Sequence, residues 1–219
     1  MNNKELTKEQ IEKNKETFLK LVNEINVDGM LKDELINYLE RTDFFYAPAS
    51  TIYHAAYVGG LCEHSLNVYN NLLKLVDQFA SFTDNGAIVR KFSESSLKIV
   101  ALFHDISKAN YYELYMRNVN TGEKNDKGKD IWIQVPTFKV KDGSERFVGV
   151  NHEVNSYIII SRYIPLSEDE LIAICNHHCS MGEVMPNKDM SYILEKHPLT
   201  ALLHMADFIS TYITENIHE

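Results

Sequence analysis

A histidine and an aspartate interrupt an otherwise apolar run at residues 99–106, where the chain reads IVALFHDI. Burying a charge in such a segment costs several kcal/mol unless something neutralises it. A metal ion does so, because adjacent imidazole and carboxylate groups, here His104 and Asp105, supply two ligands from one short stretch of backbone. Further groups of the same kind are His64, His152, His177, His178 and Asp207. The sequence therefore predicts a metal site.

Length and composition are those of one globular domain. The chain has 219 residues, with 44% apolar and 24% charged residues, which is enough to bury a core without disulfides or other staples. Its net charge is −9. An acidic surface repels polyanions, so a long nucleic acid gripped by its phosphates is disfavoured as a partner.

Three cysteines offer an alternative to the histidine and carboxylate site. Cys175 and Cys179 flank His177 and His178, so a thiolate zinc site has to be considered. We prefer free thiols in a reducing compartment, because the number of cysteines is odd and their spacing fits no disulfide framework. Residues 1–5 lack the apolar core of a signal peptide, and no apolar stretch approaches the ~20 residues of a membrane span. We therefore expect a soluble, cytoplasmic protein with no membrane segment.

Apolar residues recur at helical intervals over most of the chain. Residues 1–42 predict two N-terminal helices, with Thr7 and Asp28 as candidate caps. Residues 43–60 are rich in aromatics and in Pro and Gly, which predicts an ordered loop. Further helices are expected at about 61–82, 93–108, 152–163, 167–178 and 198–213. Ser167 with Glu170 predicts a capping box, and Pro198 is a suitable first-turn residue.

The stretch 117–150 has a different pattern. Alternating apolar residues at 131–140 predict a strand, in which Pro136 favours an edge position. Asp142–Gly143 is a hairpin-turn signal before a second short strand at 146–148. We therefore predict an all-α domain spanning residues 1–219, with a small β-hairpin inserted at 117–150.

Four short motifs resemble those of one known superfamily. Residues 53–66 read YHAAYVGGLCEHSL, which resembles the opening motif of the HD superfamily of metal-dependent phosphohydrolases. The likeness is greatest to the branch of bacterial 3′–5′ exoribonucleases and conjugation-associated HD proteins. Residues 103–108, FHDISK, resemble the namesake His-Asp motif with its trailing lysine. Residues 176–178 and 206–207 resemble the later ligand segments, in the right order.

The resemblance implies a helical bundle that holds one or two divalent ions. The first ion would be held by His64, His104, Asp105 and Asp207. In two-metal members the aspartate bridges to a second ion, whose histidines map onto His152 and His177. Transition metals such as Mn, Fe, Co, Ni or Zn suit this ligand mixture better than Mg. Adjacent residues on a helix differ by about 100°, so we assign His177 as the ligand and leave His178 as a second-sphere group, a substrate contact or a ligand of a third ion.

The implied reaction is cleavage of a phosphate ester by a metal-activated water, with Asp105 and Lys108 as catalytic residues. Lys108 would neutralise charge on the phosphoryl group, although a lysine at a helix end also has a purely structural explanation. Tyr111 and Arg117, with Tyr112 and Trp132, can supply a wall for a base and a phosphate. The substrate-binding candidates are thus Lys108, His178, Tyr111 and Arg117.

Two departures from the superfamily pattern and several rival functions remain. Ser107 stands where Gly is common, and Ala55 where a second histidine is often found. We find no counterpart of the exoribonucleases' separate oligonucleotide-binding domain in these 219 residues, and we therefore expect a nucleotide or short oligonucleotide as the phosphorylated substrate. The rivals are a single-strand 3′–5′ exonuclease, a di-iron oxygenase with nearly the same ligands, and a binding module without activity. The sequence leaves the oligomeric state open.

Overall fold

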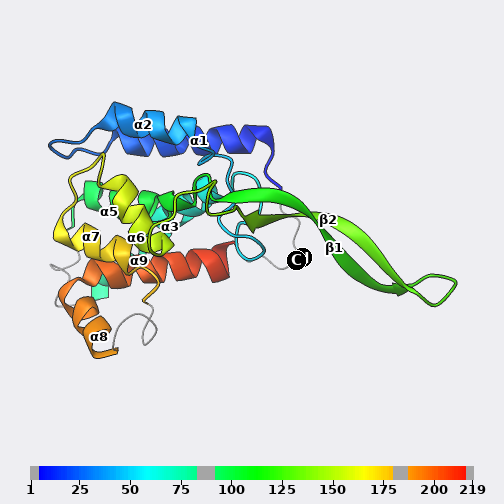
Figure 1. Ribbon diagram of the computed structural model, residues 1–219. Helices are drawn as coiled ribbons and strands as arrows, with labels where there is room; N and C mark the ends of the chain where they lie inside the picture. The colour runs from blue at the N-terminus through cyan, green and yellow to red at the C-terminus, as the bar shows by residue number, and fades with distance from the viewer. Residues whose placement is uncertain (1–4, 83–91, 180–186, 216–219) are drawn as a thin grey trace.

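The computed structural model describes residues 5–82, 92–179 and 187–215. They form a mostly helical body from which a two-stranded antiparallel sheet projects (Figure 1). The sequence-based expectation of a helical fold with a hairpin is confirmed at this level. Within the described ranges, no helix is both long enough and apolar enough to cross a bilayer.

The centre of the body is a short helix that is buried on every side. All residues of α5 (Glu94–Phe103) from 97 to 103 are buried, which is the pattern of a helix inside the core rather than on its surface. Ser93 caps it by accepting a hydrogen bond from the backbone N–H of Ser96 at 3.0 Å. This helix packs against α3 (Gly60–Phe82), α7 (Glu168–Cys175) and the first helix of the chain. The α9 helix (Pro198–Ile209) packs on α3 and α7, and α6 (His152–Ile160) packs on α7 and on the turn that follows α5.

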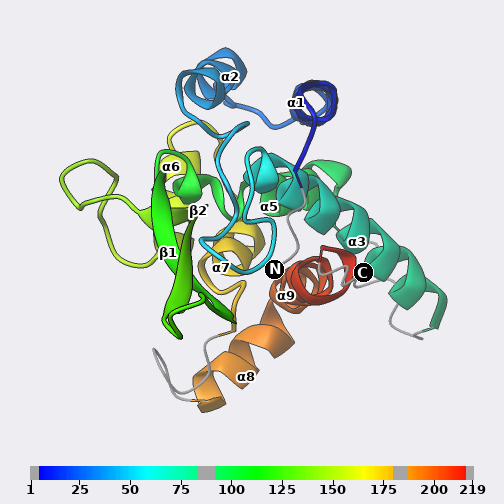
Figure 2. The same ribbon diagram turned by 90° about the vertical axis from the view of Figure 1, so that its right-hand side faces the viewer.

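The two N-terminal helices, α1 (Lys8–Asn23) and α2 (Lys32–Arg41), lie together along one side of the body (Figures 1 and 2). Phe18 of α1 is fully buried, with its ring centroid 4.9 Å from that of Phe44 and 5.8 Å from that of Phe103 at the end of α5. These helices therefore share one hydrophobic core with the rest of the body.

Local sequence signals set several helix starts. Ser167 forms a capping box, Thr7 caps α1 and Pro198 occupies the first turn of α9, as predicted; Thr7 also forms a capping box, with Gln10. The assignment of Asp28 as a cap is wrong, because α2 begins four residues later, at Lys32. Asp28 lies instead in a turn with Gly29, whose φ of 79° favours glycine.

The helices that carry site residues are shorter than predicted. The α5 helix ends at Phe103 and is followed by a 3₁₀ turn, Ile106–Lys108, so that His104 and Asp105 lie at the junction. The α7 helix ends at Cys175, just before the two adjacent histidines. Helix ends bring side chains together from different directions, which a longer regular helix would not allow.

The C-terminal part holds two elements that the sequence did not predict. One is α8 (Asn187–Lys196), which precedes α9. The other is a π-helical turn, Ser210–Thr214, which continues α9. Asn71 on α3 donates hydrogen bonds to the hydroxyl oxygens of Ser210 at 2.9 Å and Thr214 at 3.0 Å, so the turn is anchored to the body.

The projecting sheet pairs β1 (Tyr112–Lys124) with β2 (Asp130–Val140), and we call these residues the arm (Figure 1). The chain turns at Asp142–Gly143 as predicted, with the backbone N–H of Glu145 donating to the carbonyl of Asp142 at 3.0 Å, but this turn closes no hairpin and the predicted strand at 146–148 is wrong. The chain reverses earlier, at residues 125–129, where the Asn125 side chain accepts two backbone hydrogen bonds and Gly128 adopts a φ of 72°. The charged residues and Gly122 of β1 are typical of a loop, so the sequence did not indicate this strand.

Candidate metal centre

Asp105 lies at the centre of a cluster of histidines, and each of its two oxygens faces a different pair. Its Oδ2 lies 3.8 Å from Nε2 of His64 and 3.5 Å from Nε2 of His104. Its Oδ1 lies 3.7 Å from Nε2 of His152 and 3.8 Å from Nε2 of His177. These histidines come from α3, the end of α5, the start of α6 and the residues after α7. The fold thus brings histidine side chains from four separate segments together around one carboxylate.

Hydrogen bonds fix the orientation of three of these rings. Nδ1 of His104 donates to the carbonyl of Ala101 at 2.9 Å, and Nδ1 of His177 donates to that of Ile174 at 2.8 Å. A carbonyl can only accept, so in both rings Nδ1 carries the proton and Nε2 offers a lone pair to the cluster. Nδ1 of His64 is held in the same way by the carboxylate of Glu215, at 3.0 Å. Rings held like this are typical of metal ligands.

Two carboxylates lie beside the buried ring of His64 and offset the effect of burial on its pKa. Its Nε2 lies 3.2 Å from Oδ1 of Asp207 on α9, and Glu215 follows the π-helical turn on its other side. Burial alone would lower the pKa of His64, but Glu215 and Asp207 outweigh burial and raise this pKa to about 10. The same contact with His64 holds the pKa of Asp207 well below its usual range, against the effect of burial. Both carboxylates are therefore ionised.

Lys108 reaches back from the 3₁₀ turn to the central carboxylate. Its Nζ lies 2.6 Å from Oδ2 of Asp105, and both side chains are buried. Burial raises the pKa of Asp105, but the ammonium group of Lys108 and the surrounding imidazoles outweigh this and hold the pKa well below its usual range. Asp105 in turn raises the pKa of Lys108 against the effect of burial. The two groups form a buried ion pair at the floor of the site.

His178 extends the cluster toward solvent. Its Nδ1 lies 3.1 Å from a carboxylate oxygen of Glu153 and its Nε2 lies 3.6 Å from Oδ2 of Asp207. Ligand atoms of His152, Glu153, His177 and His178 all lie within 4.8 Å of one another. His178 is thus within reach of the same cation as His177, as well as of the pocket.

The donor set fits divalent metal ions. Oδ1 of Asp105 and Nε2 of His152 and of His177 are buried and have no hydrogen-bond partner, which is costly for groups that nothing else satisfies. Ligand atoms of one ion lie about 3–3.5 Å apart when each bond is about 2.1 Å long. The separations of 3.5–3.8 Å between Asp105 and the four histidines, and of 3.2 Å between His64 and Asp207, are close to this. The residues could hold one ion on each side of Asp105.

The cysteines do not join this cluster. Cys62, Cys175 and Cys179 are free, and no group of potential metal ligands within the described ranges includes them. Burial, with a further contribution from Glu153, raises the pKa of Cys175 and of Cys179 to about 11. Because neither cysteine is grouped with other potential ligands, the fold gives no support to a thiolate zinc site among the described residues.

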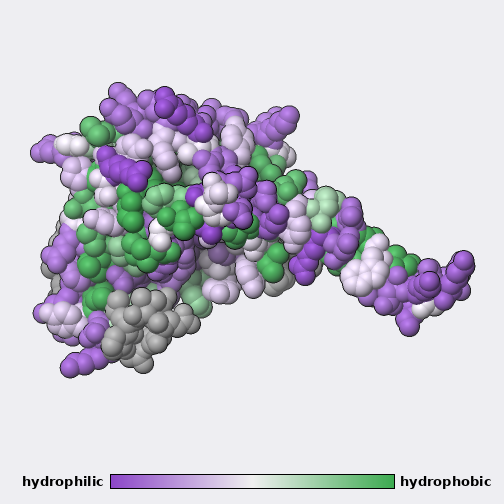
Figure 3. All heavy atoms as spheres, in the orientation of Figure 1, coloured by the Kyte–Doolittle hydropathy of each residue, from purple (hydrophilic) through white to green (hydrophobic). Residues whose placement is uncertain are grey.

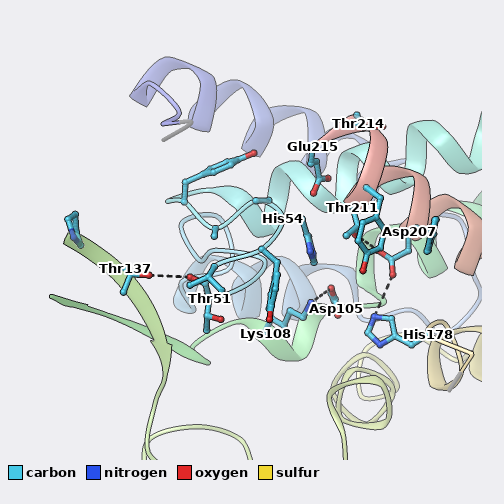
Figure 4. A pocket seen from close by; sticks show the side chains of 18 of the residues that line it. Thr51, His54, Asp105, Lys108, Thr137, His178, Asp207, Thr211, Thr214 and Glu215 are labelled. Carbon is cyan, nitrogen blue, oxygen red and sulfur yellow. Dashed lines mark hydrogen bonds and ion pairs between the residues drawn. The ribbon is translucent and has the colours of Figure 1, made fainter. Parts of the chain in front are cut away.

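A cavity of about 840 Å³ opens beside the cluster (Figure 4). Asp105, Lys108, His178 and Asp207 face it from the cluster. The loop before α3 and the arm form the opposite wall, and the hydroxyl of Thr137 on β2 donates to the carbonyl of Thr51 at 3.4 Å, which joins the two. Four aromatic rings also line the cavity: Tyr53, Tyr57, Phe208 and Tyr212.

The predicted substrate-binding residues divide into two groups. Lys108, His178 and Arg117, the last from β1, all line the cavity. Tyr111 does not line it, because its ring packs under the guanidinium group of Arg146, whose central carbon is 4.7 Å from the ring centroid. Trp132 is likewise absent from the lining and is 60% exposed on the arm.

Three residues close to the cluster were not assigned a role from the sequence. The carboxylate of Glu215 contacts Nδ1 of His64, and the carboxylate of Glu153 contacts Nδ1 of His178. His54 lines the cavity with its ring centroid 4.8 Å from that of His64, and its Nε2 is buried without a hydrogen-bond partner. His54 stands inside the recognised motif, and Glu153 directly follows a predicted ligand. No sequence signal marks Glu215, whose position depends on the π-helical turn.

Comparisons with protein-family models, with curated proteins and with solved structures give no match for this chain.

Proposed function

We propose that this chain is a metal-dependent phosphohydrolase of the HD type, which cleaves a phosphate ester of a nucleotide or short oligonucleotide. The observation that carries the proposal is the placement of Asp105, with two histidine Nε2 atoms facing each of its oxygens. A single carboxylate shared between two sets of nitrogen ligands is an arrangement that can bridge a pair of divalent ions.

In this proposal the protein holds two ions with separate ligand sets. His64, His104 and Asp207 hold one ion together with Oδ2 of Asp105. His152 and His177 hold the other together with Oδ1, and His178 is close enough to join them. Two such ions, when bound, lower the pKa of a water molecule and neutralise charge on a phosphoryl group.

Lys108 and Arg117 provide the positive charge for the substrate. Lys108 keeps its charge beside Asp105 and faces the cavity, so its ammonium group can contact a phosphoryl oxygen as charge develops there. Arg117 faces the same cavity from the arm and can bind a second anionic group. A phosphate ester is therefore a better match for this cavity than a neutral substrate.

The aromatic wall favours a nucleotide over a simple phosphate monoester. Tyr53, Phe208 and Tyr212 offer ring faces on which a base can stack, a contact worth about 1–3 kcal/mol per base in single-strand binders. The cavity falls in the range of about 300–1,000 Å³ that is usual for small-molecule sites. A net charge of −9 disfavours a long polyanion, which ranks a processive exonuclease below a nucleotide or short oligonucleotide hydrolase.

The test combines metal analysis with hydrolysis of a generic ester. Purified protein supplied with Mn²⁺ should cleave bis-p-nitrophenyl phosphate or a member of a nucleotide panel. Asp105→Ala should lower turnover by roughly 10⁴-fold, on the scale of removing a group central to catalysis. Elemental analysis should show one ion lost in His64→Ala and the other in His177→Ala. His197→Ala, whose imidazole pairs with Asp169 outside the cluster, is the matched control and should keep both ions.

Two outcomes would reject the proposal. Undiminished hydrolysis by Asp105→Ala, with its helical circular dichroism intact, would show that the cluster is not the catalytic site. Iron-dependent oxygen consumption without ester cleavage across the panel would favour an oxygenase in its place.

A further inference from the structure

His54 brings an unpartnered nitrogen to the cavity, which lies between the helical body and the arm that projects from it (Figure 3). Five side-chain atoms among the described residues are buried without a hydrogen-bond partner, and three of them belong to the proposed metal ligands Asp105, His152 and His177. The other two are Nε2 of His54 and Oγ1 of Thr200, and only His54 lines the cavity. Leaving a buried polar atom unpaired is costly, so Nε2 of His54 points to a ligand that would pair with it.

The backbone around His54 is held in place by its own loop. The backbone N–H of Ala49 donates to the carbonyl of Ala55 at 3.0 Å, which closes the loop. Inside it, the hydroxyl of Ser50 donates to the carbonyl of His54 at 2.7 Å and accepts from the backbone N–H of Tyr53 at 3.0 Å. Ala55 adopts a φ of 43°, a conformation that residues other than glycine rarely hold unless their surroundings impose it. The loop therefore fixes the point from which the His54 side chain enters the cavity.

The ring of His54 points toward the ion pair of Lys108 and Asp105 (Figure 4). Lys108 lines the same cavity, so an imidazole and an ammonium group face one space beside the cluster. The two groups are not hydrogen-bonded to each other, because Nε2 of His54 has no partner. An ammonium group only donates hydrogen bonds, and an imidazole with its proton on Nε2 donates from that atom. An anionic oxygen can accept from both groups at once.

A cation is a poorer match for His54 than an anionic oxygen. The potential metal ligands grouped with His54 are His64 and Glu215, whose ligand atoms lie within 4.8 Å of one another. Nδ1 of His64 and the carboxylate of Glu215 already contact each other at 3.0 Å. A cation shared with His54 would have to break this contact, and the ammonium group of Lys108 would repel it.

We propose that His54 is a substrate-binding residue, whose Nε2–H donates a hydrogen bond to a phosphoryl oxygen of the ester beside Lys108. The inference rests on the proposed function, and it adds an imidazole donor to the groups that bind the phosphoryl group. Loss of a hydrogen bond to a charged group weakens binding by roughly 10- to 100-fold. Phosphoryl oxygens are present in substrate and product, so inorganic phosphate can serve as the probe.

Binding of inorganic phosphate to Mn²⁺-loaded protein, measured by isothermal titration calorimetry, tests the contact without turnover. His54→Asn should weaken phosphate binding by roughly 10- to 100-fold, because its amide is too short to reach the position of Nε2. His54→Gln should retain most of the affinity, because its longer side chain can place an amide nitrogen at that position. His197→Asn is the matched control and should bind phosphate like wild type, since its imidazole pairs with Asp169 outside the cluster.

Metal affinity separates this role from that of a metal ligand. Competition with a coloured chelator should give the same metal affinities in wild type, His54→Asn and His54→Gln, and circular dichroism should show each variant folded. Equal phosphate affinity in wild type and His54→Asn would overturn the proposal. So would loss of metal from His54→Asn, an equal loss of phosphate affinity in the Asn and Gln variants, or a wild-type protein that binds no phosphate at millimolar concentration.

The outcome can be told apart from that of the proposed function. Hydrolysis that is lost in Asp105→Ala, together with phosphate binding that is unchanged in His54→Asn, would reject the role of His54 alone. Phosphate binding that depends on His54, in a protein that cleaves no ester, would reject the proposed function and support the contact between His54 and phosphate.

Discussion

Glu215 shows how a single side chain outside the ligand set can control a metal site. Its carboxylate oxygens lie 3.0 and 3.1 Å from Nδ1 of His64, and Asn67 donates a hydrogen bond to one of them at 3.0 Å. The contact holds a proton on Nδ1 of His64 and turns Nε2 toward Asp207 and Asp105. Partners of this kind raise the basicity of a ligating histidine and fix its orientation.

Replacing Glu215 should weaken metal binding on one side of the site. We expect Glu215→Gln to lower the affinity of the ion held by His64 by about 10- to 100-fold, which is the range for such partners. The ion held by His152 and His177 should be unaffected. Competition with a coloured chelator measures both affinities, and Glu195→Gln, an exposed carboxylate on α8, is the control. Equal affinities in wild type and Glu215→Gln would remove this role from Glu215.

His54 should make the metal-free protein sensitive to acid. Burial and the nearby positive groups His64 and Lys108 lower its pKa to about 4, against about 6.5 in an unfolded chain. Between these values the unfolded chain binds a proton that the folded chain does not. The stability from neutral His54 is therefore complete above about pH 6.5 and is lost as the pH falls toward 4.

A His54 variant isolates this contribution. In metal-stripped protein, His54→Gln should reduce the slope of the unfolding free energy against pH, between about pH 6 and 5, by up to about 1.4 kcal/mol per pH unit, equivalent to one proton. Urea unfolding at each pH measures the slope. If wild type and variant lose stability in parallel on acidification, the imidazole of His54 is not the group that stays neutral.

At the scale of elements, the site depends on where helices end. The 3₁₀ turn after α5 and the start of α6 are joined by a chain of serine hydrogen bonds. Ser107 donates its hydroxyl to the carbonyl of His152 at 2.7 Å, and Ser156 both donates to that hydroxyl and accepts from the backbone N–H of Ser107. The departure from glycine at position 107 thus positions the helix that carries His152 against Asp105.

Ser156→Ala tests this junction. It leaves the buried N–H of Ser107 without a partner, which should lower the unfolding free energy by about 1–3 kcal/mol. It should also lower the affinity for the ion held by His152 more than the affinity for the ion held by His64. Chemical denaturation and the chelator competition provide the two readouts. Ser161→Ala at the exposed end of α6 is the control, and a Ser156→Ala protein as stable as this control would refute the structural role of the junction.

Structural features that depend on only a few neighbouring residues could be predicted from the sequence. The caps at Thr7 and Ser167 and the first-turn Pro198 depend only on neighbouring residues, and the structure has all three. The strand β1 was missed because its second half, residues 117–124, is mostly polar and contains Gly122, which is typical of a loop. Asp142–Gly143 does form a turn, but no strand follows it, so this local signal did not mark the hairpin.

Site residues that depend on contacts between distant parts of the chain could not all be predicted from the sequence. The potential ligands could be found because His104 and Asp105 are out of place in an apolar run and because short motifs accompany the other histidines. Glu215 could not, because it reaches His64 only through the π-helical turn that follows α9. The early end of α5 was also hidden, since residues 99–103 are apolar throughout and carry no stop signal.

At the scale of the whole molecule, the potential ligands tie distant parts of the chain together. They lie on α3, at the end of α5, at the start of α6, after α7 and on α9, so the unfolded chain cannot present them as a set. An ion that binds the folded state alone stabilises it by about 2.7 kcal/mol at a hundred times its dissociation constant. In a chain of this size each kcal/mol raises Tm by about 2–4 °C.

Metal binding should therefore appear as thermal stabilisation that depends on Asp105. We expect Mn²⁺ or Zn²⁺ at about a hundred times its dissociation constant to raise Tm by roughly 5–11 °C, and a chelator to reverse the shift. Asp105→Asn keeps the shape of the side chain but removes the charge shared by both ligand sets, so most of the shift should disappear. Differential scanning calorimetry with and without metal measures both proteins. An equal shift in wild type and Asp105→Asn would mean that the stabilising ion binds elsewhere on the molecule, away from the histidine cluster.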